Sequence, residues 1–404
     1  MMGSSASKDT ATTQQKFLIG SLTRKSDLDQ KFFKLSYHCL TQSPTSLTEN
    51  RDIDLHEKNE KCFTENQHIQ HEIMDLGNND AVESIGCRAV RGDNKRSSKI
   101  LNHNYDNECM VSVPDLFLPI LGSKKLVCAQ TYVAWRSIMD LEKLKSLLVK
   151  RRLIYLVQVD DFPDFLNNFR VPFHSEEITI FDLAEKFLGV FFTGMTVKWI
   201  QSLSIAERKW DITSRHHKKT GKFQYLVTDF FPLLANICPK DGYCIMGLIW
   251  SDLYPKEELN FVLGEAHNSF KSGIVSFGRF EPKTYIEGIH QDIISVTTEV
   301  VWKLLKCLSH ELCHLFGMAH CDFFGCTMNG SGSVKDAMDQ PLFLCPVCVR
   351  KLQHICKFDI LERYENMEKF LVEMNKQFPS ERWNRSMVWI QNCLKYLKTT
   401  ATYL

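Results

Sequence analysis

The chain of 404 residues is long enough for about two or three domains, and its hydrophobic fraction of 44% suffices for a substantial core. Lysine and arginine number 49 against 48 aspartates and glutamates, so the net charge of +1 excludes a general charge attraction to nucleic acid or to an anionic membrane. No apolar run reaches the roughly 18 residues that a membrane-spanning helix requires, so no membrane span is predicted.

The N-terminal stretch MMGSSASKDTATTQQKF contains no apolar segment of the kind found in secretory signal peptides. We therefore expect a cytoplasmic or nuclear location. In such a reducing compartment the 15 cysteines would serve as buried thiols or metal ligands before they formed disulfides.

Residues 1–110 carry mixed charges and little apolar periodicity, as in ENRDIDLHEKNEKCFTENQHIQHE. This composition favours an extension that is largely disordered or loosely helical, and we expect its removal to leave a folded chain. The predicted organisation continues with a folded domain over residues 111–375 and ends with a helical extension over residues 376–404.

From residue 114 onward, helical and strand patterns alternate along the chain, which predicts an α/β fold. Apolar stripes with the helical period predict helices over residues 132–150, 179–192, 229–238, 298–316 and 385–398. Runs of β-branched and aromatic residues predict strands over residues 152–159, 195–203, 219–227, 243–250, 260–267 and 273–280. The strand over 243–250 is apolar on both faces, which is typical of a central strand covered by helices on each side.

The stretch RHHKK, residues 215–219, is a short basic cluster. Its spacing does not favour a metal or phosphate site, and we interpret it as a solvated loop.

The long helix predicted near residue 300 contains SHELCHLFGMAHC. His310 and His314 are four residues apart, so both imidazoles project from one helical face and can hold one ion. Gly317 ends the helix and lets the chain bend, so that His320 can return to the same metal. Three neutral nitrogens around a tetrahedral Zn²⁺ leave the fourth position for water, which is the open arrangement of a catalytic site.

Glu311 directly follows the first histidine and lies within reach of a metal-bound water. There it would act as general base, taking a proton as the water attacks a polarised carbonyl and delivering it to the leaving amine. The alternative is a helix with incidental surface histidines. The spacing favours zinc peptidase chemistry.

The pattern H-E-x-x-H-x-x-G-x-x-H is the metzincin signature, and a methionine turn should follow it. CTMNG supplies Met328, eight residues after the third histidine. Its side chain would form a hydrophobic floor beneath the metal ligands. Without this spacing, Met328 would be interpreted as an ordinary core methionine.

Cys321 and Cys326 are followed by Cys345 and Cys348, in a C-x4-C and a C-x2-C arrangement. Four thiolates in two close pairs are typical of a closed structural zinc site. The alternative, two disulfides, is disfavoured by the lack of a recognisable signal sequence. Because Cys321 directly follows the third histidine, we expect this second zinc to fix the segment that carries that ligand.

The combined pattern HExxHxxGxxHC-x4-C-x-M followed by C-x-x-C resembles the archaemetzincins, because other metzincins lack the four cysteines. The stretches CIMGLIWSDLYP, FVLGEAH, GIVSFGRF and PLFLCPVCVRKLQH are similar to vertebrate-type members of that family. The likeness covers residues 115–395 and leaves out the first ~110 residues. Sixteen residues separate Met328 from Cys345, one fewer than in the family pattern, within a loop that belongs to neither site.

The resemblance implies a compact zinc metallopeptidase, with residues 111–375 as its catalytic domain. It implies a twisted, mainly parallel sheet with an active-site helix, and a small C-terminal subdomain that contains the four-cysteine zinc site. The cleft should lie between them, with the strand over 260–267 as the edge where an extended peptide can pair.

Family members are aminopeptidase-like or poorly active, so the resemblance implies small peptides as substrates. We expect two zinc ions per chain, one catalytic and one structural, and a peptide partner, with neither nucleic acid nor a membrane span involved. The competing function is a catalytically weak, zinc-bound scaffold or interaction module.

Overall fold

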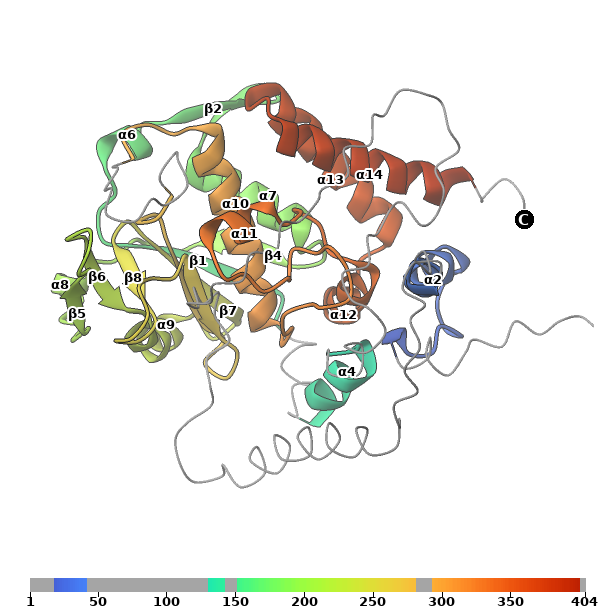
Figure 1. Cartoon of the computed structure of the whole chain (residues 1–404), viewed down its shortest axis with the longest axis horizontal. Coiled ribbons are helices and arrows are strands. Elements are labelled where there is room, and N and C mark those ends of the chain that lie inside the picture. Colours follow the sequence, from blue (N-terminus) through green and yellow to red (C-terminus); the bar gives the residue numbers. More distant parts are fainter. Residues whose placement is uncertain (1–17, 42–129, 142–150, 281–292, 400–404) are drawn as a thin grey trace, which may run out of the picture.

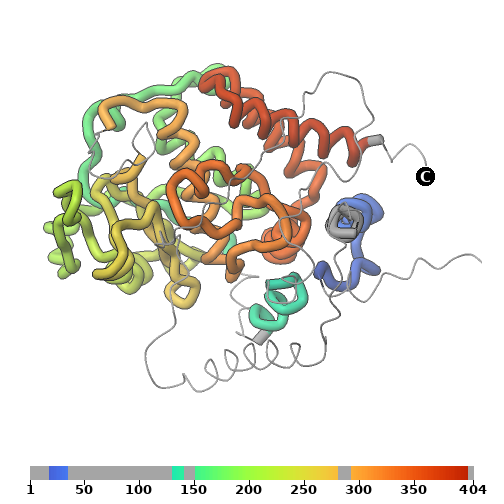
Figure 2. Tube along the Cα trace, in the orientation of Figure 1, coloured from blue at the N-terminus to red at the C-terminus, as the bar shows by residue number. Residues whose placement is uncertain are grey.

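The protein is represented by a computed structural model that describes residues 18–41, 130–141, 151–280 and 293–399 (Figures 1 and 2). Its centre is a five-stranded sheet in the order β4-β1-β7-β10-β9. The strands are β1 (Leu153–Val159), β4 (Thr196–Trp199), β7 (Gly242–Ile249), β9 (Gly264–His267) and β10 (Ser272–Ser276). Neighbouring strands are parallel except β9, which pairs antiparallel with β10 at one edge of the described sheet. The predicted α/β fold with a mainly parallel sheet is confirmed.

Helices cover both faces of this sheet, which is why β7 is buried along its whole length (Figure 1). Successive side chains of a strand point to opposite faces. Ile245 and Ile249 accordingly belong to one hydrophobic core, and Met246 and Leu248 belong to another. The first core includes helix α9, and the second includes α7 and α10. These helices are α7 (Ile180–Phe191), α9 (Phe230–Ile237) and α10 (Thr298–Leu315).

Smaller elements surround the central sheet. A hairpin and a second sheet contain β2 (Arg170–Phe173), β3 (Glu176–Thr179), β5 (Ser214–His216), β6 (Phe223–Leu226) and β8 (Asp252–Tyr254). The short helices are α6 (Asp164–Asn167), α8 (Ile205–Arg208), η4 (Val227–Asp229) and α11 (Val334–Asp339). The C-terminal part is helical, with α12 (Pro346–Cys356), α13 (Ile360–Gln377) and α14 (Glu381–Thr399). Within the described ranges, no helix is long and apolar enough to cross a membrane.

Strands β4, β6, β9 and β10 are shorter than their apolar patterns indicate, and β6 and β9 show how pairing decides the length. The pattern over 219–227 gives β6, which pairs with β5 and β8 in the second sheet. The pattern over 260–267 gives β9 only from Gly264 onward, because Val262 forms a bridge with Leu253 of β8. Periodicity names no pairing partner for a strand, so tertiary structure decides both.

The C-terminal helix is packed into the fold. Helix α13 continues to Gln377, so the boundary predicted after residue 375 falls inside a helix. Trp383 of α14 is fully buried, and its ring meets Trp302 of α10 edge to face with a centroid distance of 4.9 Å. Helix α14 is therefore joined to α10 through this contact between two tryptophan rings.

Two helices precede the central sheet in sequence, α2 (Asp27–Thr41) and α4 (Tyr132–Leu141). The rest of the helix predicted over 132–150 lies outside the described residues. Helix α2 lies beside the C-terminal helices, as the blue and orange tubes of Figure 2 show.

Helix α2 departs from the expectation of a dispensable N-terminal extension. Phe32 and Phe33 are fully buried. The ring of Phe32 meets Tyr364 of α13 edge to face at 5.5 Å, and the Arg350 guanidinium of α12 lies 5.2 Å from the ring centroid of Phe33. Two adjacent phenylalanines within a polar stretch are too short a signal for periodicity to detect.

Replacing Phe32 by alanine should lower the free energy of unfolding by about 3 kcal/mol or more, because it leaves a cavity among buried side chains. The control Val372→Ala truncates a side chain that is 43% exposed, and should change this free energy by less than about 0.5 kcal/mol. Urea unfolding measures both. Equal stability of Phe32→Ala and the parent chain would show that α2 adds nothing to the fold.

Candidate metal centres

Helix α10 carries two histidines against the sheet. The Thr297 side chain accepts a hydrogen bond from the backbone N–H of Val300 and so caps the helix, as its sequence predicts. His310 and His314 lie one turn apart, and their Nε2 atoms are 3.1 Å apart. Both imidazoles are buried on one helical face.

The third histidine reaches the other two through a turn at Gly317. This residue has a φ of +74°, in the left-handed region that favours glycine. A Cβ atom there would lie only 2.8 Å from Met139 Sδ. Beyond the turn, the ligand atoms of His310, His314 and His320 all lie within 4.8 Å of one another.

Backbone carbonyls fix the orientation of the two helical imidazoles. His310 Nδ1 lies 2.8 Å from the carbonyl oxygen of Thr327, and His314 Nδ1 lies 2.7 Å from that of Met318. A carbonyl oxygen only accepts, so each Nδ1 must donate, which leaves the lone pair of each Nε2 for a metal. Within the described residues, the buried His320 Nε2 has no hydrogen-bond partner.

Burial keeps all three imidazoles neutral. It lowers the pKa of His310 well below its usual value and that of His314 to about 3, and it also lowers the pKa of His320. The neighbouring Lys306 ammonium lowers all three further. Neutral imidazole is the form that binds metal, so three such nitrogens at this spacing fit a zinc ion.

Glu311 is buried beside the histidines, against the edge strand β9. A Cβ atom at Gly264, the first residue of β9, would lie 3.1 Å from Glu311 Cγ and 3.0 Å from the carbonyl oxygen of Ile274. A larger residue at this position would displace either the glutamate or strand β10. Glycine therefore leaves space for the carboxylate between the histidine helix and the sheet edge.

The turn around Met328 is tied to the segment that carries His320. Met328 is fully buried, and its carbonyl accepts a hydrogen bond from Cys321 N at 2.6 Å. The Asn329 side chain donates to the carbonyl of Cys321 at 2.6 Å and accepts from Cys326 N at 2.8 Å. The role of the Met328 side chain as a floor beneath the histidines stays a prediction, and the sequence reasoning missed Asn329.

Sequence reasoning also missed Lys306, one turn before His310. Its side chain is only 2% exposed, and Nζ donates to the carbonyl of Thr327 at 2.6 Å and to Gln340 Oε1 at 2.9 Å. Because Thr327 O also accepts from His310 Nδ1, one carbonyl connects the lysine, the histidine and the Met turn. A charged residue four positions before the first histidine, inside an apolar helix, is the signal that points to it.

The four cysteines form a second cluster at the beginning of α12. Cys321, Cys326, Cys345 and Cys348 are buried, and their sulfur atoms lie within 4.8 Å of one another. None of the four is in a disulfide, and the sulfurs of Cys321 and Cys345 lie 3.6 Å apart, against about 2.05 Å for a disulfide. Hydrogen bonds from the three other thiols hold the pKa of Cys321 well below its usual value. The alternative of two disulfides does not describe this structure.

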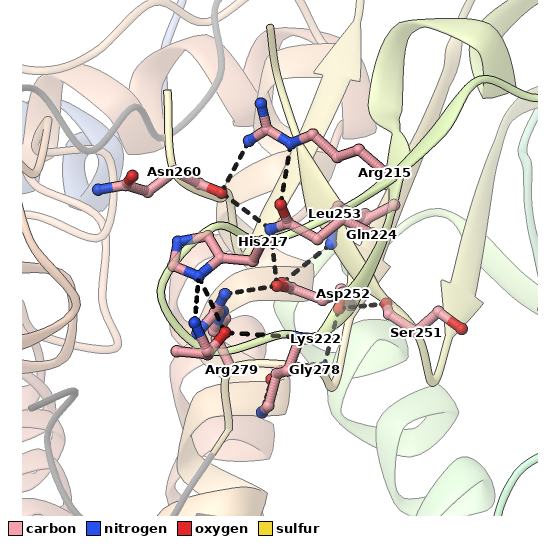
Figure 3. Close-up of polar contacts among 12 residues, drawn as sticks. Arg215, His217, Lys222, Gln224, Ser251, Asp252, Leu253, Asn260, Gly278 and Arg279 are labelled. Carbon is pink, nitrogen blue, oxygen red and sulfur yellow. Dashed lines mark hydrogen bonds and ion pairs between the residues drawn. The ribbon is translucent and has the colours of Figure 1, made fainter. Parts of the chain in front are cut away.

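A buried polar cluster supports the segment that leads to β9 (Figure 3). Asp252 and Arg279 form an ion pair of 2.7 Å, with side chains that are 2% and 1% exposed. The Gln224 amide donates to Asp252 Oδ2 and to the carbonyl of Asn260, which also accepts from Arg215. Side chains of the second sheet therefore hold the chain immediately before strand β9.

Two residues of RHHKK are not solvated, which corrects the interpretation of this stretch. The Arg215 guanidinium lies 3.8 Å from the ring centroid of Tyr254. His217 is 4% exposed, and its Nδ1 accepts a hydrogen bond from the backbone N–H of Thr220 at 3.1 Å. Burial, together with the charges of Arg279 and Arg215, lowers the pKa of His217 to about 4.

Comparison with known proteins gives a family match for part of the chain. Residues 213–354 match the model of peptidase family M54. Archaemetzincin-2 from Mus musculus is 30% identical over 241 residues, which cover 55% of this chain and 64% of that protein. Archaemetzincin-1 from Homo sapiens is 30% identical over 220 residues, which cover 49% and 44%. Over these residues the chain is similar to the archaemetzincins.

The chain spans less than two thirds of the length of these curated relatives. The crystal structure of an archaemetzincin from Methanopyrus kandleri is 24% identical, with a TM-score of 0.38, over 52% of this chain and 97% of that chain. The family match contains Glu311, the three histidines and the four cysteines. Helices α2, α4, α13 and α14 lie outside it.

The free energy of unfolding should fall as the pH decreases from about 6.5 toward 4, because the unfolded chain binds a proton at His217 in this range while the folded chain does not. His217→Gln removes this titration, so the variant should lose less stability than the parent over the same range. Urea unfolding at pH 7, 6, 5 and 4.5 checks the difference between the two chains. Identical pH slopes would contradict a neutral, buried His217.

Proposed function

We propose that this protein is a zinc-dependent metallopeptidase that hydrolyses small peptides in an aminopeptidase-like manner. The observation that carries the proposal is the convergence of three neutral imidazoles beside Glu311, two of them buried and that of His320 half-buried. The Nδ1 hydrogens of two of these imidazoles are already bound by carbonyls. Their Nε2 lone pairs therefore converge on a point that a cation satisfies.

His310, His314 and His320 would hold the catalytic ion. When bound there, zinc supplies a Lewis acid that polarises a carbonyl and lowers the pKa of water. Glu311 would take a proton from the attacking water and return it to the leaving amine. Its burial between α10 and β9 limits competing bulk water around the carboxylate.

The position of the edge strand β9 supports the proposal of a peptide substrate. It is paired on one side with β10, and its first residue, Gly264, lies against Glu311. An extended peptide that pairs with such an edge gains backbone hydrogen bonds and lies beside the carboxylate. The preference for small peptides follows from the family resemblance.

A second zinc ion would occupy the four-cysteine cluster and serve the fold. Four sulfurs make a closed site with no position for substrate. The cluster joins the segment after His320 to the beginning of α12, so its binding free energy is folding free energy for the loop between them. The total is two zinc ions per chain.

Glu311→Gln should slow peptide hydrolysis by at least ~100-fold while zinc binding stays nearly unchanged, because the amide cannot accept the proton. Glu299→Gln, in the first turn of the same helix, provides the matched control and should keep the parent rate. Digestion of a peptide library with and without chelator, followed by metal analysis, measures both properties. Hydrolysis by Glu311→Gln at the parent rate would refute the mechanism, and a parent without chelator-sensitive hydrolysis would favour the scaffold.

The two zinc ions should have separable effects. Cys345→Ser should lose one zinc, lower the melting temperature and, through the Cys321–His320 segment, weaken the other site. His314→Ala should lose one zinc with much less loss of stability, because the helix that carries it is packed independently of the ion. Metal analysis and thermal melts of both variants decide this. A single zinc in the parent would contradict the two-site proposal.

A further inference from the structure

The segment that carries His320 has few backbone partners of its own. Residues 317–320 follow the end of α10 and belong to no helix or strand. The N–H groups of Gly317 and Met318 donate to carbonyls of α10, and the carbonyl of Met318 is bound by His314. The carbonyl of Gly317 and the N–H of Ala319 are instead bound by a distant part of the chain. Buried backbone groups require such partners, because leaving them unpaired is costly.

One side-chain amide supplies partners for both residues. Gln130 Nε2 donates to the carbonyl oxygen of Gly317 at 3.1 Å, and Gln130 Oε1 accepts from the N–H of Ala319 at 3.0 Å. The two ends of the amide therefore bind positions on either side of Met318, in the manner of a strand partner. Gln130 is separated from this segment by 187 residues or more.

Gln130 is itself held in place. Lys351 of α12 is 2% exposed, and its Nζ donates to the carbonyl of Gln130 at 2.7 Å and to its Oε1 at 2.9 Å. Gln130 directly precedes Thr131, whose hydroxyl accepts from Ala134 N at the start of α4. Trp135 of α4 is fully buried, and its Nε1 donates to the carbonyl of Phe316 at 3.1 Å.

We infer that Gln130 is a positioning residue for the third metal ligand, His320. Because His310 and His314 are fixed by one helix, the affinity of the three-histidine site depends on how well the segment before His320 is held. Gln130 binds the backbone of Gly317 and Ala319, so it acts on His320 through these two residues. The inference rests on the proposed function, since it assigns a role in the same zinc site.

Zinc release from the full chain tests the inference. Release into a chromogenic chelator should occur in two phases, a faster one from the open three-histidine site and a slower one from the closed four-cysteine site. Gln130→Met keeps the length of the side chain and loses both hydrogen bonds. It should weaken zinc binding at the three-histidine site by about 10- to 100-fold, seen as faster release in the first phase only.

Two further variants separate positioning from general destabilisation. Gln130→Glu keeps an acceptor for Ala319 N and Lys351 Nζ but cannot donate to Gly317 O, so its first phase should lie between those of the parent and Gln130→Met. Gln377→Met is the matched control, because its amide donates to Glu373 on α13, away from both sites, and it should release zinc as the parent does.

Three outcomes would overturn the inference. If Gln130→Met released zinc in the first phase at the same rate as the parent, the inference about Gln130 would be overturned. The proposed function would still stand. Equal acceleration of both phases would show general loosening instead of positioning. A parent chain with no zinc at the three-histidine site would overturn the proposed function and the inference together.

Discussion

The approach of His320 to the helical histidines is the constraint on which the rest of the site depends. Helical geometry fixes His310 and His314 relative to each other. His320 lies beyond a left-handed turn at Gly317, in a segment without secondary structure, so other parts of the chain must place it. The turn around Met328 and helix α4 form hydrogen bonds with residues next to this segment. The cysteine cluster is joined to the segment directly, because Cys321 follows His320 in the chain.

Buried cations bind backbone carbonyls of segments that are distant in the chain. Burying a lysine or arginine costs free energy unless its donors are satisfied, and a loop carbonyl needs a donor for the same reason. Here the two requirements meet, because long side chains from helices donate to carbonyls of distant segments. The pairs are Lys306 with Thr327, Lys351 with Gln130, Arg350 with Ile19, and Arg363 with Phe191.

Helix α12 connects the two proposed metal sites. Its beginning carries Cys345 and Cys348, and Lys351 on the next turn holds Gln130. The cysteine cluster therefore acts on the segment of His320 from both ends. One path runs through Cys321, the neighbour of that histidine, and the other runs through Gln130 and the turn at Gly317. Loss of order in α12 would therefore reach the three-histidine cluster by both paths.

The sequence by itself determined the elements whose signals are local. Two histidines four residues apart must share a helical face, two close cysteine pairs make a cluster, and alternating periods give an α/β sheet. Only the tertiary structure decided which strands β6 and β9 pair with, that Phe32 and Phe33 join the core, and that Lys306 and Gln130 bind the loops around the histidines. These contacts join a polar side chain or a short apolar pair to a segment far along the chain. Such contacts have no period and no fixed spacing, so the chain must fold before they are defined.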